Sequence, residues 1–512
     1  MKKIISLALA LLMLAALLAP ATAEGRTGGT LIALLPSDPT SYNPDAAMDD
    51  YSITVMENIV NKLVKFDYAG NLIPDLAESW TVSEDGLTLT YNLRKGVKWH
   101  DGEAFSSEDV LWSLNKIKAE GYIGYTLMGV TDIAAPDENT VVLTLAQPDA
   151  SLIYNMAYFG MYILPKHLYD GQDWATCDAA TKLPIGTGAY KFVEHNKGVS
   201  LTLEANMDYF LGAPQTDKII YSIIPDATTA TQAFLNGELD FLGTFASTTE
   251  LENLKAAGAT VITRPFASRY YIAFNFDREP TNNLELRKAI ALALNRQEVL
   301  DKGLGGIGAV AEGFAPAAIA WAYNDQDVMP AFDPAKAAQV LEASGLKKGD
   351  DGFYCTLNLV TMTGWDDPAT VIKANLREIG INVNISIMDM GAYSNAVLVD
   401  HDFDITLLSG NHGPDASAMS MRVGTGGAVN VMNYSNPAID ELYAKALLVS
   451  AQEERAAYYK EAQKILSQDL PILPLCEAVI TEVSASYLSD TPLSAEKLST
   501  LGEMFTIKMN NQ

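Results

Sequence analysis

The sequence is poor in cysteine and in basic residues. Its three cysteines, Cys177, Cys355 and Cys476, are far apart and odd in number, so at most one disulfide can form within the chain. They lack C-x-x-C spacing and neighbouring histidines, which disfavours a zinc site, and we expect at least two to be buried structural thiols. With 35 Lys and Arg against 63 Asp and Glu, the formal net charge is -28. Nucleic-acid binding is therefore disfavoured, because phosphate contacts need clustered basic residues.

Long hydrophobic runs are confined to the N-terminus. Lys2 and Lys3 precede residues 4–18, which are apolar except for Ser6, and the small residues Ala21-Thr22-Ala23 follow. This order is typical of a cleavable secretory signal peptide over 1–23. The run is short for a spanning helix, and no later stretch reaches the required length without a charge or a helix breaker. We therefore expect an exported protein that is soluble once processed.

Catalytic signatures are also missing from the sequence. The patterns G-x-S-x-G, H-E-x-x-H and G-x-x-x-x-G-K do not occur, and no two histidines are four residues apart. Asp402 and Asp404 fall on one face of a predicted strand beside His401, although such residues more often solvate a strand edge than bind metal. We expect a protein that is not an enzyme and has no metal or cofactor. A secreted glycoside- or peptide-processing hydrolase stays open as an alternative, since two carboxylates could meet in the folded chain.

The densest run of local signals extends from Asn71 to Leu114. After the turn at Asp85-Gly86, hydrophobic residues occupy alternate positions over 87–93, which predicts a half-buried β-hairpin. Ser106 with Asp109 three positions later predicts a capped helix start. A second hairpin is expected over 130–145. These elements together predict a rigid module that needs no catalytic residue.

Two glycine-rich segments do not fit nucleotide-binding loops. Residues 183–192, LPIGTGAYKF, lead into an alternating strand, whereas a phosphate loop leads directly into a helix, so we interpret Gly186 and Gly188 as backbone turns. The G-x-G-x-x-G spacing over 303–308 follows a predicted helix and lacks the preceding strand that a dinucleotide site requires.

The first module and the segment 184–190 resemble the family 5 solute-binding proteins. The residues that carry the resemblance are LAESW, the D-G hairpin, RKGVKWHDGE and S-x-x-D over 76–109, and a match to the pattern P-x-G-T-G-P-Y. Members of this family are extracytoplasmic receptors of ABC importers for dipeptides, oligopeptides or nickel. The resemblance implies a monomeric receptor that captures a peptide between two lobes and delivers it to an ABC permease. It also implies a free periplasmic or secreted protein, because no lipidation cysteine follows the signal.

Strand, helix and strand alternate over 219–241 and over 358–387, which predicts two α/β lobes. The resemblance implies a two-lobed periplasmic-binding-protein-like fold of class II, cluster C type, with an extra domain inserted in the first lobe. We expect lobe I over 24–45, 165–266 and 478–512, the additional domain over 46–164, and lobe II over 267–477.

The resemblance also suggests where a ligand would bind. The family's peptide binders hold the ligand ammonium with an Asp, whose position in the loop 408–415 is taken here by Asn411, with Asp415 displaced. The Arg that clamps a carboxylate is missing near Trp365. Trp365 for stacking and Asn411 for hydrogen bonding would suit an oligosaccharide or another uncharged solute, which is the alternative ligand. His412, and Tyr51 on the cleft wall, complete the predicted site, although Trp365 could instead be core and His412 a turn residue.

Overall fold

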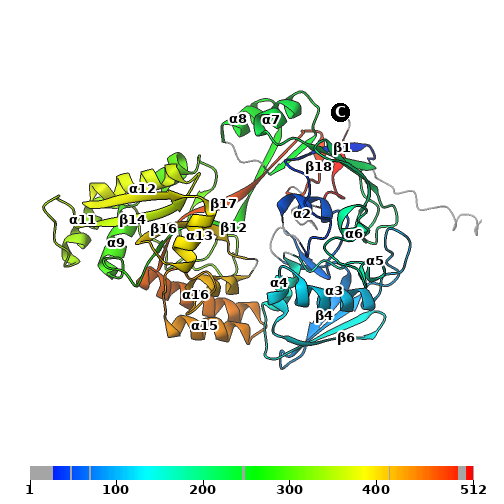
Figure 1. Cartoon of the computed structure of the whole chain (residues 1–512), viewed down its shortest axis with the longest axis horizontal. Coiled ribbons are helices and arrows are strands. Elements are labelled where there is room, and N and C mark those ends of the chain that lie inside the picture. The colour runs from blue at the N-terminus through cyan, green and yellow to red at the C-terminus, as the bar shows by residue number, and fades with distance from the viewer. Residues whose placement is uncertain are drawn as a thin grey trace, which may run out of the picture.

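The computed structural model describes residues 27–46, 49–67, 71–158, 160–244, 248–413, 415–493 and 503–510. The predicted signal peptide, 1–23, lies outside this part of the chain. Two lobes, joined by a pair of long strands, stand side by side in Figure 1. The predicted two-lobed α/β fold is therefore confirmed.

The two long strands are β12 (Thr260–Phe274) and β17 (Ile472–Ser484), which pair antiparallel and pass from one lobe to the other (Figure 1). They connect the strands of both lobes into one sheet of eleven strands in the described part of the chain. The expected lobe boundaries at 266/267 and 477/478 fall inside these strands. Two large hydrophobic clusters, one over 31–241 with 488–507 and one over 271–476, give each lobe its own core.

Lobe I is built on parallel strands. β1 (Thr30–Leu35) lies between β10 (Lys218–Ile223) and β11 (Phe241–Thr244) and is parallel to both, as the strand-helix-strand order predicted. The helix that connects β10 to β11 in the chain is α7 (Ala227–Leu235). The remaining elements of this lobe are β8 (Tyr190–Asn196), β9 (Ser200–Ala205), α5 (Lys166–Tyr169), α6 (Asp178–Thr181), α8 (Thr248–Ala256), β18 (Leu488–Ser489) and β19 (Lys508–Met509).

The predicted additional domain contains a four-stranded antiparallel sheet. Its order is β4 (Ala77–Val82), β5 (Thr88–Leu93), β7 (Thr140–Leu145) and β6 (Val130–Asp137), which are the two expected hairpins. α3 (Ser107–Glu120) begins with the expected capping box between Ser106 and Asp109. The other elements are α2 (Asp50–Met56), β2 (Val64–Phe66), β3 (Leu72–Pro74), η1 (Gly124–Leu127) and α4 (Leu152–Ala157).

Lobe II contains a second parallel unit, in which β14 (Cys355–Met362) and β15 (Ile381–Met388) flank α12 (Asp366–Glu378) in sequence. β16 (Ile405–Asn411) lies between β14 and β12. The other elements are α9 (Leu284–Ala293), α10 (Arg296–Glu298), η2 (Val299–Gly303), β13 (Ala309–Val310), α11 (Pro334–Ala343), α13 (Met390–Ser394), η3 (Asn395–Val399), η4 (Ala416–Met419), α14 (Ser420–Val423), α15 (Pro437–Leu447) and α16 (Gln452–Asp469).

Three local expectations need correction. The helix predicted to precede Gly303 is divided, because α9 ends at Ala293 and Asn295 caps a new helical turn through its side chain. Gly186 and Gly188 are needed for a close approach of two backbones, and a Cβ at Gly186 would lie 1.8 Å from the Ile59 carbonyl oxygen. Among the cysteines only Cys476 is buried, and all three are free thiols.

Candidate functional site

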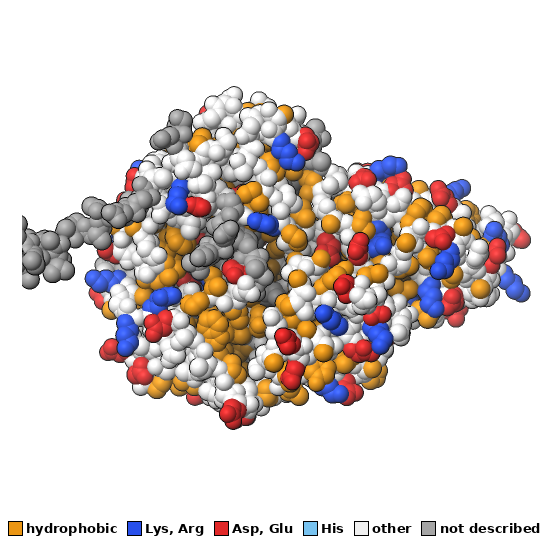
Figure 2. Space-filling model, turned by 180° about the vertical axis from the view of Figure 1, so that it is seen from behind, with side chains coloured by type: hydrophobic (Ala, Val, Ile, Leu, Met, Phe, Trp, Pro, Cys, Tyr) orange, Lys and Arg blue, Asp and Glu red, His pale blue; other side chains and the backbone are white. Residues whose placement is uncertain are grey.

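The two lobes meet again at α4, away from the connecting strands (Figure 1). The backbone N–H of Ala150 donates to the carbonyl of Leu447 at 3.0 Å. The guanidinium of Arg455 on α16 lies 5.4 Å from the centre of the Tyr154 ring on α4. Seen from behind, the surface is hollowed where the lobes adjoin, and hydrophobic side chains line part of the hollow (Figure 2). The segments around α4 and the end of β16 are therefore the facing walls of the candidate site.

Asn411 is the predicted site residue that reaches the opposite lobe. It ends β16, and its side-chain amide nitrogen contacts the hydroxyl of Tyr158, which directly follows α4. Its side-chain oxygen accepts from the Gly413 N–H at 2.8 Å, and its backbone carbonyl accepts from Arg422 at the same distance. The amide of Asn411 is thus held in a fixed orientation between the lobes.

His412, the next residue, is fully buried in lobe II. Its Nδ1 lies 2.8 Å from the Met419 sulfur, and its ring centre lies 5.8 Å from that of Tyr271. Burial lowers the pKa of His412 well below its usual range, and the charges of Arg269 and Arg422 lower it further. The imidazole is therefore neutral and acts as a packed part of the loop in this conformation.

Asp415 is also fully buried, and its carboxylate binds a cation of the protein itself. Arg455 Nη2 lies 2.6 Å from Asp415 Oδ1, and the same oxygen caps η4 by accepting from the Ser417 N–H at 3.0 Å. The guanidinium of Arg455 also lies over the rings of Tyr154 and Tyr459. In this arrangement Asp415 fixes the loop that follows Asn411.

The two predicted aromatic residues lie on different lobes. Trp365 sits at the start of α12, half-buried, with its ring centre 5.5 Å from that of Tyr270. Tyr270 on β12 pairs with Ser409 on β16, which places Trp365 next to the strand that ends at Asn411. Tyr51 lies in the first turn of α2, with 36% of its surface exposed.

The sequence did not reveal the residues that contact the predicted site residues, because these partners lie elsewhere in the chain. Tyr154 and Tyr158 come from the other side of the cleft, and Arg422 and Arg455 come from later helices. Only Arg455 left a signal that could have been used, because it stands four residues before Tyr459 on one helix face. The remaining contacts depend on tertiary structure.

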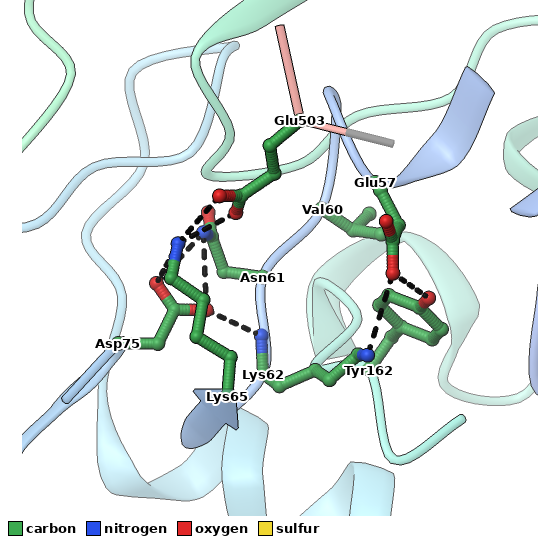
Figure 3. Close-up of a pocket in the computed structure, with 8 residues that line it drawn as sticks. All are labelled: Glu57, Val60, Asn61, Lys62, Lys65, Asp75, Tyr162 and Glu503. Atoms are coloured by element: carbon green, nitrogen blue, oxygen red, sulfur yellow. Dashed lines mark hydrogen bonds and ion pairs between the residues drawn. The ribbon is translucent and has the colours of Figure 1, made fainter. Parts of the chain in front are cut away.

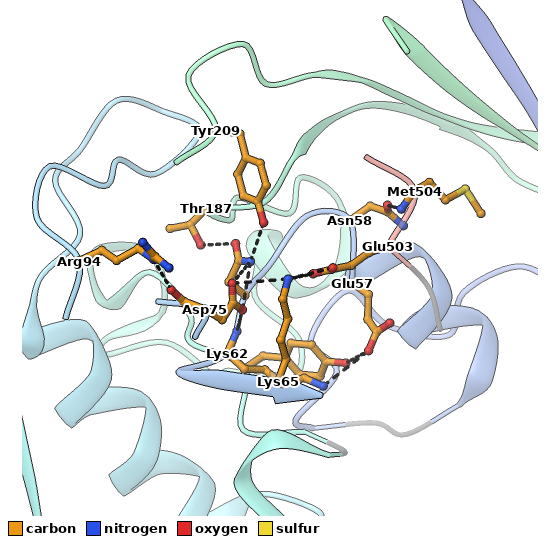
Figure 4. Close-up of polar contacts among 12 residues, drawn as sticks. Glu57, Asn58, Lys62, Lys65, Asp75, Arg94, Thr187, Tyr209, Glu503 and Met504 are labelled. Atoms are coloured by element: carbon orange, nitrogen blue, oxygen red, sulfur yellow. Dashed lines mark hydrogen bonds and ion pairs between the residues drawn. The ribbon is translucent and has the colours of Figure 1, made fainter. Parts of the chain in front are cut away.

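A separate small pocket of about 10 Å³, room for about one water molecule, lies between the predicted additional domain and Glu503 of lobe I. Figure 3 shows its lining residues, and Figure 4 shows the polar contacts around it. Lys65 binds both carboxylate oxygens of Glu503, at 2.6 and 2.9 Å, and lies 3.8 Å from Asp75. Lys62 lies 3.5 Å from Glu57. Two lysines thus pair with three carboxylates here, and this buried ionic network connects Glu503 to residues 57–75.

Within the described residues, no three or more His, Cys, Asp or Glu side chains gather as a metal ion would require. The candidate ligands near His401 have other contacts: Asp402 binds Arg278 at 2.7 Å, and Asp404 accepts from the Asn358 N–H. The same part of the chain contains no helix that is both long and apolar enough to span a membrane.

Comparison with known proteins places the chain among binding proteins. Residues 71–430 match the model of bacterial extracellular solute-binding proteins, family 5. The di/tripeptide-binding protein 3 of Pseudomonas aeruginosa is 29% identical over 491 residues, which cover 89% of this chain and 90% of that protein. The dipeptide-binding protein of Escherichia coli is 25% identical, with 88% and 90% covered.

Solved structures agree with this assignment. The ABC transporter substrate-binding protein CtaP of Listeria monocytogenes superposes with a TM-score of 0.83 at 26% identity, covering 95% of this chain and 100% of the other. The periplasmic binding protein DppA of Helicobacter pylori, in complex with the peptide STSA, superposes with a TM-score of 0.75 at 27% identity, covering 95% and 99%.

Proposed function

The chain belongs to the family 5 bacterial extracellular solute-binding proteins, and we propose that it is the receptor of an ABC importer that captures peptides between its two lobes. The main support is that α4 and the end of β16 face each other, so that Asn411 and Tyr158, from different lobes, are in contact. A solute held there touches both lobes at once. Similar proteins named for di- and tripeptides support the ligand class.

Capture between lobes has a simple physical basis. Only a conformation with both walls in place contacts the solute from two sides, so binding shifts the population of the lobes toward that conformation. The closed form would then dock on a membrane permease and release the peptide. We propose that the predicted site residues line this site or hold its loop in place, and that Asp415 does so through Arg455. These residues are Tyr51, Trp365, Asn411, His412 and Asp415.

The cellular location follows from the sequence. We propose that residues 1–23 are removed on export and that the mature protein works as a free monomer in the periplasm or outside the cell, since no cysteine stands directly after the signal. The match to a family of solute-binding proteins supports a role in binding.

A thermal-shift screen of the mature protein tests this proposal. The probes are mixtures of di- to pentapeptides, malto-oligosaccharides and nickel chloride. A ligand at about 100 times its dissociation constant stabilises the folded protein by about 2.7 kcal/mol, which raises Tm by a few degrees. Stabilisation by peptides is expected. Stabilisation by oligosaccharides or nickel alone would contradict the peptide assignment and identify a different solute for the same fold.

A further inference from the structure

Arg422, on α14, is a buried cation with no carboxylate within ion-pair distance among the described residues. Its residue surface is 8% exposed. Its Nη2 donates to the Asn411 carbonyl at 2.8 Å, whereas its Nε has no hydrogen-bond partner. The buried Arg269 and Arg455 differ, because they lie 2.9 Å from Glu477 and 2.6 Å from Asp415. A buried guanidinium without a counter-charge is destabilising, so this position suggests a negative group from outside the chain.

The surroundings of Arg422 supply no counter-charge for it. Arg269 on β12 is completely buried, and Glu477 is the acid that pairs with it. His412 is buried and lies close enough for the charges of both arginines to lower its pKa further, so its ring stays neutral. Hydrogen-bond partners are also missing for the Nε of Arg269 and the Nε2 of His412. Among the described residues, Glu477 is thus the one carboxylate at ion-pair distance from these two guanidinium groups, and it pairs with Arg269.

This cluster lies directly behind the loop that bridges the lobes. A Cβ at Gly410 would come within 3.1 Å of Arg422 Nη2, so the guanidinium packs against the backbone of the loop. The next residue, Asn411, contacts Tyr158 of the opposite wall. The unpaired Nε of Arg422 and the cross-lobe contact therefore belong to one site.

We propose that Arg422, together with the amide of Asn411, receives a carboxylate of the captured solute. A peptide would then lie with its carboxyl end at this loop, and the proposal rests on the peptide-receptor function proposed above. An ammonium group here would meet two guanidinium groups, while Asp415, the acid of the loop, already binds Arg455. The electrostatics thus favour a carboxylate over an ammonium at the end of β16.

The test uses randomised tetrapeptide libraries in four forms: free, C-terminally amidated, N-acetylated, and modified at both ends. Thermal shift and calorimetry compare the wild type with Arg422→Gln. The matched control is Arg278→Gln, because Arg278 lies near the opposite end of β16, is partly exposed and pairs with Asp402. This control removes the same charge from the same lobe without touching the cleft.

We expect amidation to weaken binding to the wild type at least tenfold and N-acetylation to weaken it less than twofold. Arg422→Gln should abolish the difference between free and amidated peptides, and Arg278→Gln should preserve it. A strong loss on N-acetylation without one on amidation would overturn the proposal, as would an unchanged preference in Arg422→Gln.

The failure of peptide binding itself would be visible separately. If no library in any form shifted the wild-type Tm, the proposed peptide function would be wrong. Sodium succinate and sodium chloride at equal ionic strength would then probe Arg422 alone. A succinate-specific shift that disappears in Arg422→Gln supports a carboxylate site for another solute, and no such shift overturns the inference as well.

Discussion

Replacing Lys65 by methionine tests how the C-terminal segment is held. The side chain of Lys65 is 2% exposed and that of Glu503 is 7% exposed, so solvent screens their ion pair little. Removing one partner of a buried pair leaves the other charge uncompensated, which costs about 3–5 kcal/mol. Lys65→Met should lower the free energy of unfolding of the first lobe, with its additional domain, by about this amount. Urea unfolding, followed by circular dichroism, measures the loss.

The double variant separates the ion pair from the other effects of each substitution. In Lys65→Met/Glu503→Gln no unpaired charge remains at position 503, although Asp75 still lies nearby. We expect the double variant to be more stable than the sum of the two single losses predicts, with a coupling energy of at least about 1 kcal/mol. Hydrogen exchange at β19 should rank the wild type, the double variant and the single variants in the same order of stability. This strand belongs to the segment that Glu503 connects to Lys65.

The pH dependence of Lys65→Met gives a second check. Burial raises the pKa of Glu503 from 4.5 to about 7, although the charge of Lys65 lowers it. Without Lys65 this pKa rises further, so the folded variant binds a proton that the unfolded chain releases above about pH 4.5. The free energy of unfolding of the variant therefore falls as the pH rises above about 4.5. Its loss of stability relative to the wild type should be larger at pH 8 than at pH 5. Equal deficits at both pH values, or a loss under about 1 kcal/mol at pH 8, would refute this account of the network.

Three further outcomes are expected. Asn411→Ala and Trp365→Ala should each weaken peptide binding tenfold or more, about 1.4 kcal/mol by calorimetry, and unchanged affinity in both would place the pocket elsewhere. Arg455→Met should destabilise lobe II by about 3–5 kcal/mol in urea unfolding, because it leaves Asp415 buried and unpaired; a loss no larger than that of Arg278→Gln would contradict this. Small-angle scattering should show a smaller radius of gyration with bound peptide, and no compaction would rule out closure of the lobes.

The local elements could largely be predicted from the sequence, because their signals are local. The hairpins, the capping box at Ser106 and the parallel unit around α12 depend on alternation, turn residues and caps within a few residues of one another. β12 shows where this fails. It begins at Thr260 because residues 260–265 gain strand structure by pairing with β17, more than 210 positions later, which no local pattern predicts.

The candidate site could be predicted only in part, for a related reason. Asn411 was found through a resemblance in its own loop. The groups that decide its chemistry, Tyr158 and Arg422, come from different elements, and the partner of Asp415 is on α16. A sequence shows that Asp415 is close to Asn411, but not that its charge is already balanced by Arg455.

Hydrogen–deuterium exchange on the mature protein, with and without a saturating peptide, tests the central claim most directly. If the peptide is held between the lobes, α4 in the first lobe and the end of β16 with residues 411–413 in the second should both become protected, and most other segments should not change. Protection confined to one lobe, or none at either wall despite measured binding, would contradict capture at this site.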